Sequence, residues 1–183
     1  MEITEIQYNV NGVNYIIRKA VDSDAEQLSM LRVTIDGETE YLDREKGEAY
    51  IDVPAFREII RRDTEKSNNL FLVAEMQGEL VGFVRCQGYD LHRFSHKVEF
   101  GVCVLKRYWR NRIGTNLLEG AIQWADRNEI RKITLTVVET NEKAIALYRK
   151  YGFEIEGVLR EDRLHSDGKY YNTIVMGRLR RMK

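Results

Sequence analysis

VEFGVCVLKRYWRNRIGTNLL, residues 98–118, is the stretch of this chain that decides its fold. Its first eight residues are mostly apolar and rich in valine, which is typical of a buried strand rather than a helix. A short basic loop, residues 106–112, follows, and Gly114 and Thr115 then open an apolar run with helical period. The order strand, basic loop, glycine and helix start is the layout of a phosphate site. The first amides of a helix lack internal partners, and the helix dipole is positive at that end.

Three arginines of this loop, Arg107, Arg110 and Arg112, would strengthen such a site, because the guanidinium fork suits phosphate oxygens. The same residues also fit an ordinary strand-to-helix connection with solvated arginines. The stretch alone does not separate these two interpretations.

Composition limits what the rest of the chain can be. The 183 residues predict one domain, and 43% hydrophobic with 32% charged residues is typical of a globular protein. Lys plus Arg and Asp plus Glu each number 29, which argues against bulk nucleic-acid binding and against a polybasic membrane anchor. No apolar run approaches the roughly 20 residues that cross a bilayer, and the acidic start MEITEI is no secretory signal. We therefore expect a cytoplasmic protein without membrane or nucleic-acid partners.

Cysteine and histidine usage predicts no metal site. Cys86 and Cys103 both fall in predicted strands, where we expect them reduced and buried. None of the three histidines has ligand spacing to a cysteine.

The hydrophobic pattern predicts one mixed α/β domain without repeats or linkers. Asn11-Gly12 is a hairpin turn signal, and Ser23 with Glu26 has capping-box spacing at the start of the first helix. The expected strands cover residues 3–10, 13–19, 69–76, 80–89, 98–105, 132–138, 153–160 and 170–178, and the expected helices cover 24–35, 54–65, 113–128 and 141–151.

A second informative stretch, residues 141–153, reads NEKAIALYRKYGF. Asn141 is a good helix N-cap, and Gly152 is a normal C-terminal glycine. Ala144, Leu147 and Tyr148 share one side of the helix by their spacing. Taken alone, a tyrosine there is more often a core residue than a catalytic one.

The two stretches together resemble the GNAT superfamily of acyl-CoA-dependent N-acetyltransferases. The pattern Asn-x-x-Ala-x-x-Leu-Tyr-x-x-x-Gly-Phe lies downstream of the strand, basic loop, glycine and helix, and the resemblance covers roughly residues 15–180. The tail at residues 167–179 is similar to the branch that includes ribosomal-protein, amino-acid and antibiotic N-acetyltransferases. The resemblance implies a single-domain acyl-CoA N-acyltransferase fold: a mixed, mostly antiparallel sheet flanked by helices, with an N-terminal β-hairpin. Within 1–183 the expected parts are the hairpin (about 3–19), acceptor-side helices (about 24–65), cofactor-binding core (about 96–157) and C-terminal strands (about 153–178).

The phosphate loop departs from the family pattern Gln/Arg-x-x-Gly-x-Gly/Ala. With the last glycine at Gly114, Trp109 stands at the Gln/Arg position and Arg112 at the first glycine. Backbone amides carry most of the work of such a loop, so these changes are tolerable if no positive φ is required. Arg110 or Arg112 is expected to replace the lost phosphate contact.

The resemblance implies direct acetyl transfer from acetyl-CoA, as co-substrate and without a metal. Tyr148 would protonate the departing sulfur, since the ordinary tyrosine pKa near 10 keeps it protonated at pH 7. Asn141 would bind the pantetheine arm. Backbone amides of the central strand would bind the acetyl oxygen and pantetheine, and the loop would hold the pyrophosphate. The implied cofactor-binding residues are Val102, Cys103, Val104, Trp109, Arg110, Asn111, Arg112, Ile113, Gly114, Thr115, Asn141 and Tyr148.

Glu99 is the candidate general base. A carboxylate amid Val98, Phe100 and Val102 is expected to be partly desolvated, which would make it a better proton acceptor. A structural salt bridge for Glu99, or deprotonation of the amine by bulk water, remains an alternative.

Other polar residues are candidates for the acceptor side. Glu38 and Glu40 follow the first helix and could hold a cationic amine together with Glu99, or could belong to a solvated loop. His92 and His96 are expected to flank the same cleft, with His96 a weaker candidate base than Glu99.

The resemblance therefore implies an N-acetyltransferase acting on a primary amine of a small molecule or on a protein N-terminus. A different acyl donor such as succinyl-CoA would need an additional cationic pocket. A catalytically silent acyl-CoA-binding or sensor module is the alternative from another class. Sheet edges at the last strands make a homodimer possible.

Overall fold

The computed structural model describes residues 5–180. These residues form a sheet of eight strands in the order β1-β2-β3-β4-β5-β6-β8-β7. The β5–β6 pair is parallel, and the other neighbouring pairs are antiparallel. The strands are β1 (Ile6–Val10), β2 (Val13–Lys19), β3 (Leu70–Met76), β4 (Glu79–Gly88), β5 (Lys97–Val104), β6 (Lys132–Val138), β7 (Glu154–Leu164) and β8 (Tyr170–Leu179). The predicted mixed, mostly antiparallel sheet is thereby confirmed.

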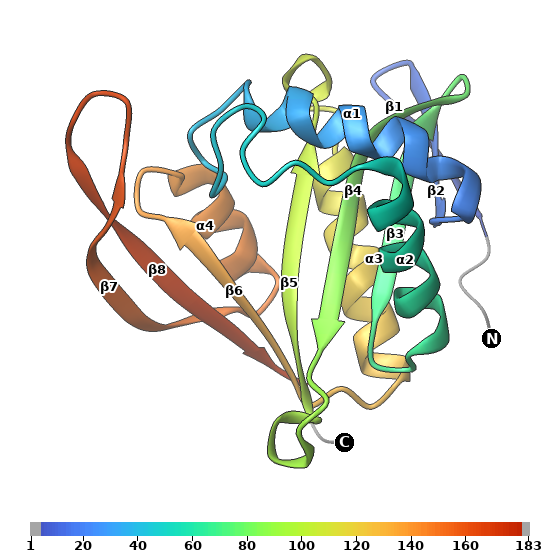
Figure 1. The fold of residues 1–183 in the computed structure, drawn as a ribbon. Coiled ribbons are helices and arrows are strands. Elements are labelled where there is room, and N and C mark those ends of the chain that lie inside the picture. The colour runs from blue at the N-terminus through green and yellow to red at the C-terminus, as the bar shows by residue number, and fades with distance from the viewer. Residues whose placement is uncertain (1–4, 181–183) are drawn as a thin grey trace.

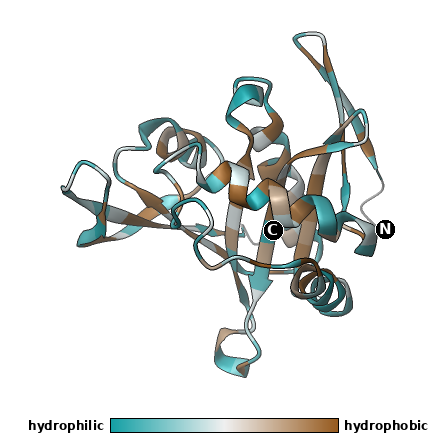
Figure 2. Cartoon of the chain, turned by 45° about the horizontal axis from the view of Figure 1, so that its top comes forward, coloured by the Kyte–Doolittle hydropathy of each residue, from teal (hydrophilic) through white to brown (hydrophobic). Residues whose placement is uncertain are grey.

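Helices cover both faces of this sheet (Figure 1). On one face lie α1 (Ala25–Asp36) and α2 (Val53–Glu65), and on the other lie α3 (Ile113–Arg127) and α4 (Glu142–Lys150). The helix α3 forms because Leu117, Leu118 and Ala121 repeat at helical spacing, and all three are fully buried against the sheet. Figure 2 shows hydrophobic residues along the central strands and on the sides of the helices that face them. No helix within residues 5–180 is long and apolar enough to cross a membrane.

The N-terminal hairpin forms as predicted. Asn11 and Gly12 both have positive φ, 53° and 78°, as a two-residue turn of type I′ requires. Residues 3 and 4 of the predicted first strand lie outside the described residues.

Two details of the sequence prediction are wrong. Ser23 does not cap a helix: it lies within a short 3-10 helix, Asp22–Asp24, and the Asp24 carboxylate accepts the Val21 N–H at 2.8 Å. The last hairpin is longer than expected, because β7 continues to Leu164 through a bulge around Glu161, whose φ is 51°.

The pairing of β5 with β6 ends early, and this creates the site. The register runs from Lys97↔Lys132 only as far as Glu99↔Thr134, and beyond it the two strands diverge (Figure 1). His96 O accepts from Lys132 N on the β6 side, whereas Leu105 N donates to Val81 O on the β4 side. Since backbone groups alternate along a strand, the N–H groups of Val102 and Val104 face the opening. The divergence therefore leaves two amides of β5 without a strand partner on that side.

Candidate active site

A cavity of about 380 Å³ lies at the opening between β5 and β6. Its walls come from β5, the basic loop, the start of α3, α4, and the end of α1 with the segment after it. Of the residues that the sequence assigned to the cofactor, it is lined by Val102, Cys103, Val104, Trp109, Arg110, Arg112, Ile113, Gly114, Thr115, Asn141 and Tyr148. We call this space the donor cavity.

Asn111 is the exception. Its side-chain amide donates to Tyr108 O at 3.1 Å, and its own carbonyl accepts from the Tyr15 hydroxyl at 3.1 Å. Tyr15 in turn accepts from the buried Asn116 amide at 2.7 Å. Asn111 therefore ties the loop to β2 and α3 and does not line the donor cavity.

Two arginines of the basic loop, residues 106–112, have a backbone conformation that favours glycine. Arg110 and Arg112 have φ values of 69° and 58°, both in the left-handed region. The condition that no positive φ is required is therefore wrong: Arg112 occupies the family's first-glycine position in the conformation that favours glycine. The first intrahelical bond runs from Asn116 N to Arg112 O at 2.8 Å. The amides of Ile113, Gly114 and Thr115 precede that bond and remain available to an anion.

Trp109 holds the loop against β5. Its indole N–H donates to Val104 O at 2.9 Å, and its ring stacks on Tyr41 with 6.4 Å between centroids. Glu38 accepts the Lys106 N–H at 2.7 Å and ties the segment between α1 and α2 to the same loop.

Tyr148 lies at the inner end of the donor cavity. It is 9% exposed and packs edge-to-face on Phe100 at 6.1 Å and against Phe153 at 5.7 Å. Burial raises the pKa of its phenol to about 12, so it keeps its proton across the physiological range. Asn141 caps α4 by accepting the Ala144 N–H at 3.3 Å, and it lines the cavity too.

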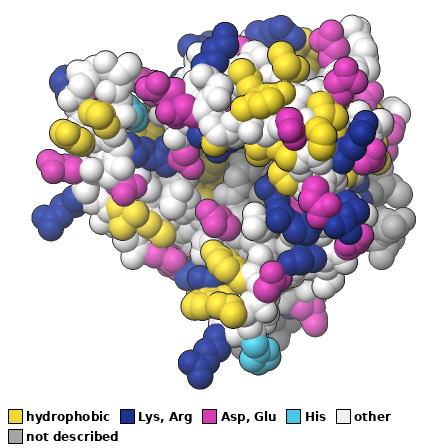
Figure 3. Space-filling view, viewed as in Figure 1, with side chains coloured by type: hydrophobic (Ala, Val, Ile, Leu, Met, Phe, Trp, Pro, Cys, Tyr) yellow, Lys and Arg dark blue, Asp and Glu magenta, His cyan; other side chains and the backbone are white. Residues whose placement is uncertain are grey.

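A second cavity of about 400 Å³ lies on the α1–α2 face of the sheet. It is lined by side chains of α1, α2, β4, β5 and β6, and by the segment between α1 and α2. Figure 3 shows this face hollowed between the α1–α2 side and the β7–β8 hairpin, with acidic and basic side chains around the hollow. We call this space the acceptor cavity. It shares six residues with the donor cavity: Tyr41, Leu42, Val102, Cys103, Asn141 and Tyr148.

Comparison with known proteins decides the family. Residues 14–153 match the family model for the acetyltransferase (GNAT) family. This chain belongs to the GNAT family.

Individual relatives agree with this membership. The GNAT chain is 37% identical over 111 residues to an L-amino acid N-acetyltransferase of Escherichia coli (strain K12), covering 60% of this chain and 67% of the relative. It is 28% identical to an N-alpha-acetyltransferase of Sulfolobus acidocaldarius, covering 92% of this chain and 95% of that one. The crystal structure of a GNAT-family acetyltransferase from Streptococcus pneumoniae superposes with a TM-score of 0.87 at 30% identity, over 90% of this chain and 99% of that chain.

Glu99 lines the acceptor cavity of this GNAT chain, but its expected desolvation is wrong. It is exposed, whereas Val98 and Phe100 are buried. Successive side chains of a strand point to opposite faces, so the apolar neighbours in sequence are not neighbours in space. Glu99 instead shares its face with Gln87, its partner on β4, and with Gly101.

The remaining polar candidates have other places. Glu40 accepts the Ser166 N–H at 2.8 Å, and Glu38 accepts the Lys106 N–H as described. Neither carboxylate lines the acceptor cavity, but both line an adjoining cavity of about 1160 Å³. The expectation that His92 and His96 flank the cleft is wrong. Both are exposed at the start of β5, the end opposite the donor cavity, and line neither cavity.

Cys103 lines both cavities but is a poor nucleophile. It is a free thiol, and burial raises its pKa well above the usual range. A protonated thiol does not form a covalent acyl intermediate readily. Cys86 is also a free thiol and is fully buried, as predicted. Cys103 was predicted to be buried as well, but the residue is only partly buried. Among residues 5–180, no cluster of three or more His, Cys, Asp or Glu side chains could hold a metal ion.

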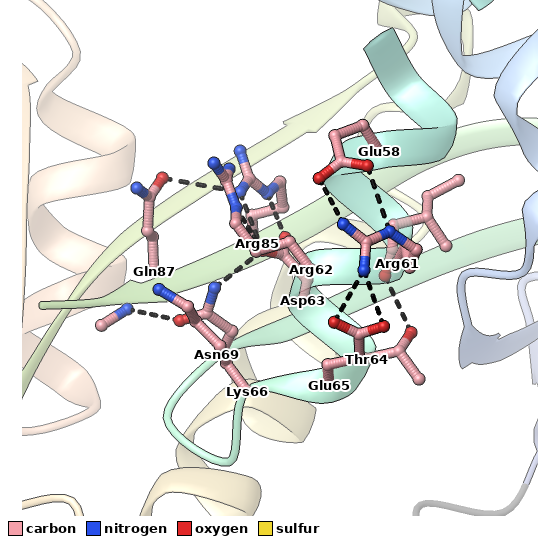
Figure 4. Close-up of polar contacts among 12 residues, drawn as sticks. Glu58, Arg61, Arg62, Asp63, Thr64, Glu65, Lys66, Asn69, Arg85 and Gln87 are labelled. Carbon is pink, nitrogen blue, oxygen red and sulfur yellow. Dashed lines mark hydrogen bonds and ion pairs between the residues drawn. The ribbon is translucent and has the colours of Figure 1, made fainter. Parts of the chain in front are cut away.

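Three arginines of the acceptor cavity were missed by sequence reasoning: Arg32, Arg44 and Arg85. They come from α1, from the segment after it and from β4. Arg85 binds Asp63 of α2 through two hydrogen bonds, 2.6 and 3.1 Å long (Figure 4). The one available signal was Arg85 within the apolar strand LVGFVRC, where a charge is costly unless paired.

Proposed function

We propose that this chain transfers the acetyl group of acetyl-CoA directly to a primary amine. One observation carries the proposal: the donor and acceptor cavities share Val102, Cys103 and Tyr148. An acetyl group at the inner end of one cavity would therefore adjoin an amine held in the other.

The chain offers a fitting set of donors for acetyl-CoA. The amides of Ile113, Gly114 and Thr115 would bind the pyrophosphate, with Arg110 and Arg112 adding positive charge at the rim of the donor cavity. The side chain of Asn141 retains an NH₂ group that can donate to the pantetheine arm, because its oxygen serves the α4 cap. When bound, acetyl-CoA supplies an acetyl group activated as a thioester.

The protein's part is to orient, polarise and move protons. The Val102 amide, directed into the opening, would stabilise negative charge that develops on the acetyl oxygen. Tyr148 holds a proton at Oη, and its raised pKa keeps that proton available for the leaving sulfur. Glu99, lining the acceptor cavity, would take up the amine proton through water, or solvent would remove it first.

The acceptor is a small-molecule amine or a peptide N-terminus. The named relatives act on amino acids or carry the name N-alpha-acetyltransferase, which supports this range of acceptors. A homodimer also remains a prediction. The edge strand β7 exposes Ile155, Val158, Leu159 and Leu164, which supports pairing with a second copy.

The decisive experiment is a thiol-release assay with acetyl-CoA and a panel of amino acids, short peptides and polyamines. Turnover with at least one amine is expected, and Tyr148→Phe should lower kcat about 100-fold. The matched control is Tyr170→Phe, because Tyr170 lies in β8, is 62% exposed and lines neither cavity. Thermal stabilisation by acetyl-CoA with no amine consumed would contradict the proposal and favour the silent acyl-CoA-binding module.

A further inference from the structure

The arginines of the acceptor cavity differ in how their charges are balanced. Among the arginines that line the cavity, only Arg85 pairs with Asp63, which binds it through both oxygens and is itself fixed by the Asn69 amide at 2.8 Å (Figure 4). Arg62, which does not line the cavity, lies 3.9 Å from the same carboxylate. Arg32 and Arg44 share a single carboxylate, Asp36.

The shared carboxylate serves Arg44 far better than Arg32. Arg44 donates to both oxygens of Asp36, at 3.0 and 3.3 Å. The Arg32 Nε lies 3.9 Å from the nearer oxygen, beyond hydrogen-bond distance. Arg32 donates instead to a neutral group, the Ala49 carbonyl, at 2.7 Å. Two guanidinium groups against one carboxylate leave one surplus positive charge in this trio.

Arg32 and Asp36 are shielded from water, whereas the Arg44 side chain is 32% exposed. The exposed fractions of Arg32 and Asp36 are 7% and 4%. Burial lowers the pKa of Arg32, and the nearby positive charge of Arg44 lowers it further. An anion arriving here would relieve both effects, because a second carboxylate supplies the missing counter-charge in a site of low dielectric.

The trio is also placed next to the junction of the two cavities. Arg32 and Arg44 line the acceptor cavity together with Cys103 and Val102 of β5, which the donor cavity shares. Across the same cavity, Glu99 presents a carboxylate. Asp43, which follows α1 and also lines the cavity, is paired with Arg163 at 2.7 Å. With that carboxylate neutralised, the cavity is cationic at Arg32 and Arg44 and anionic at Glu99.

We propose that Arg32 and Arg44 bind a carboxylate of the acceptor, so that the acceptor is a zwitterion with its carboxylate close to its amine, as in a free amino acid. This inference rests on the proposed acetyl transfer and selects among its acceptors. The ammonium end of such a molecule suits the Glu99 side before it loses its proton. A polycation, in contrast, would be repelled by Arg32 and Arg44, whose two positive charges are balanced by one carboxylate, Asp36.

The test compares each of a panel of L-amino acids with its own amide, which removes the carboxylate and changes little else. The acid should have a kcat/KM at least about tenfold higher than the amide, the loss expected for one charge-assisted hydrogen bond. The difference in amine basicity alone would favour the amide, because an amino acid amide is the weaker base and has more neutral amine at a given pH. A preference for the acid therefore reports on binding of the carboxylate.

Variants of Arg44 test whether this residue causes the preference for the acid over the amide. Arg44→Met leaves Arg32 and Asp36 as a neutral pair, so KM for acids should rise about tenfold while KM for amides stays the same. Arg44→Lys, which keeps the charge, should recover part of the preference. Arg93→Met is the matched control, because Arg93 is exposed near the start of β5 and lines neither cavity. Thermal unfolding of each variant checks that the fold is intact.

Three outcomes would overturn the inference. If amides or polyamines are acetylated as well as the acids, acetyl transfer stands and the carboxylate site does not exist. If Arg44→Met lowers turnover of acids and amides equally, Arg44 has only a structural role. Should no amine be acetylated, calorimetric titration with the amino acids still decides: binding that is lost in Arg44→Met supports the site, and no binding to the wild type refutes it.

Discussion

The donor and acceptor cavities adjoin each other, yet they are built in different ways. The donor cavity is built mainly from one continuous stretch, β5 through the start of α3, and is completed by α4 and by the end of α1 with the segment after it. Its proposed phosphate contacts are the backbone amides at the start of α3. The acceptor cavity gathers Arg32, Arg44, Arg85 and Glu99 from four separate segments. The donor side is thus specified by backbone geometry and the acceptor side by charges that meet only in the folded chain.

The sharpest way to separate the two sides is to fill each with a side chain. Gly101 on β5 faces the acceptor cavity, and a Cβ there would meet nothing within 4 Å. Gly101→Val should therefore fold normally, since valine suits a strand, and raise KM for the amine more than tenfold by overfilling the cavity. KM for acetyl-CoA should stay unchanged. Steady-state kinetics with each substrate varied in turn would show this, and an equal rise in both KM values would contradict the separation.

The complementary variant is Gly114→Val on the donor side. A Cβ at Gly114 has Val104 Cγ2 as its neighbour at 3.8 Å, an ordinary contact, so the helix should tolerate it. Because Gly114 lines the donor cavity alone, KM for acetyl-CoA should rise about fivefold and KM for the amine should not. A change in amine KM without a change for acetyl-CoA would reverse the assignment of the two cavities.

The backbone of the loop gives a smaller effect, on stability. Arg112→Gly should raise the free energy of unfolding by about 0.5–1 kcal/mol, because glycine adopts the left-handed conformation without the Cβ clash. Its exposed ion pair with Glu119, 3.5 Å long, contributes little. Arg107→Gly is the control, since Arg107 lies in a 3-10 helix with ordinary φ, and there glycine should destabilise. Urea unfolding measures both; destabilisation by Arg112→Gly would show that the arginine side chain outweighs the strain.

The last effect appears only at alkaline pH. The pKa of Tyr148 rises from 10.0 to about 12 on folding, so its contribution to stability is full below pH 10 and is lost as pH rises through 12. Across that window the unfolded state releases the phenolic proton first. The free energy of unfolding of the wild type should therefore fall more steeply with pH than that of Tyr148→Phe, by at most about 1.4 kcal/mol per pH unit. Parallel slopes would mean that the phenol is not buried.

The same contrast explains what the sequence could predict. The donor side was readable because a strand, a basic loop and a helix start are local patterns, and Asn141 and Tyr148 lie at fixed spacing on one helix. The positive φ of Arg112 could not be predicted, because no local sequence pattern indicates that an arginine will adopt the left-handed conformation of the glycine it replaces.

The acceptor side could not be read in this way. Arg32 and Arg44 meet only because the segment after α1 folds back over the helix, and the pairing of Arg85 with Asp63 joins a strand to a helix 22 residues away. The environment of Glu99 was misjudged for a related reason, since neighbours along a strand point to opposite faces.

The central claim is that both substrates meet at one junction and that no covalent acyl-enzyme is formed. Initial velocities measured with acetyl-CoA and the best amine varied together test it most directly. The account predicts intersecting double-reciprocal lines, because both cavities must be filled before transfer. Parallel lines, with an acetyl group recovered on Cys103 after exposure to acetyl-CoA alone, would contradict it.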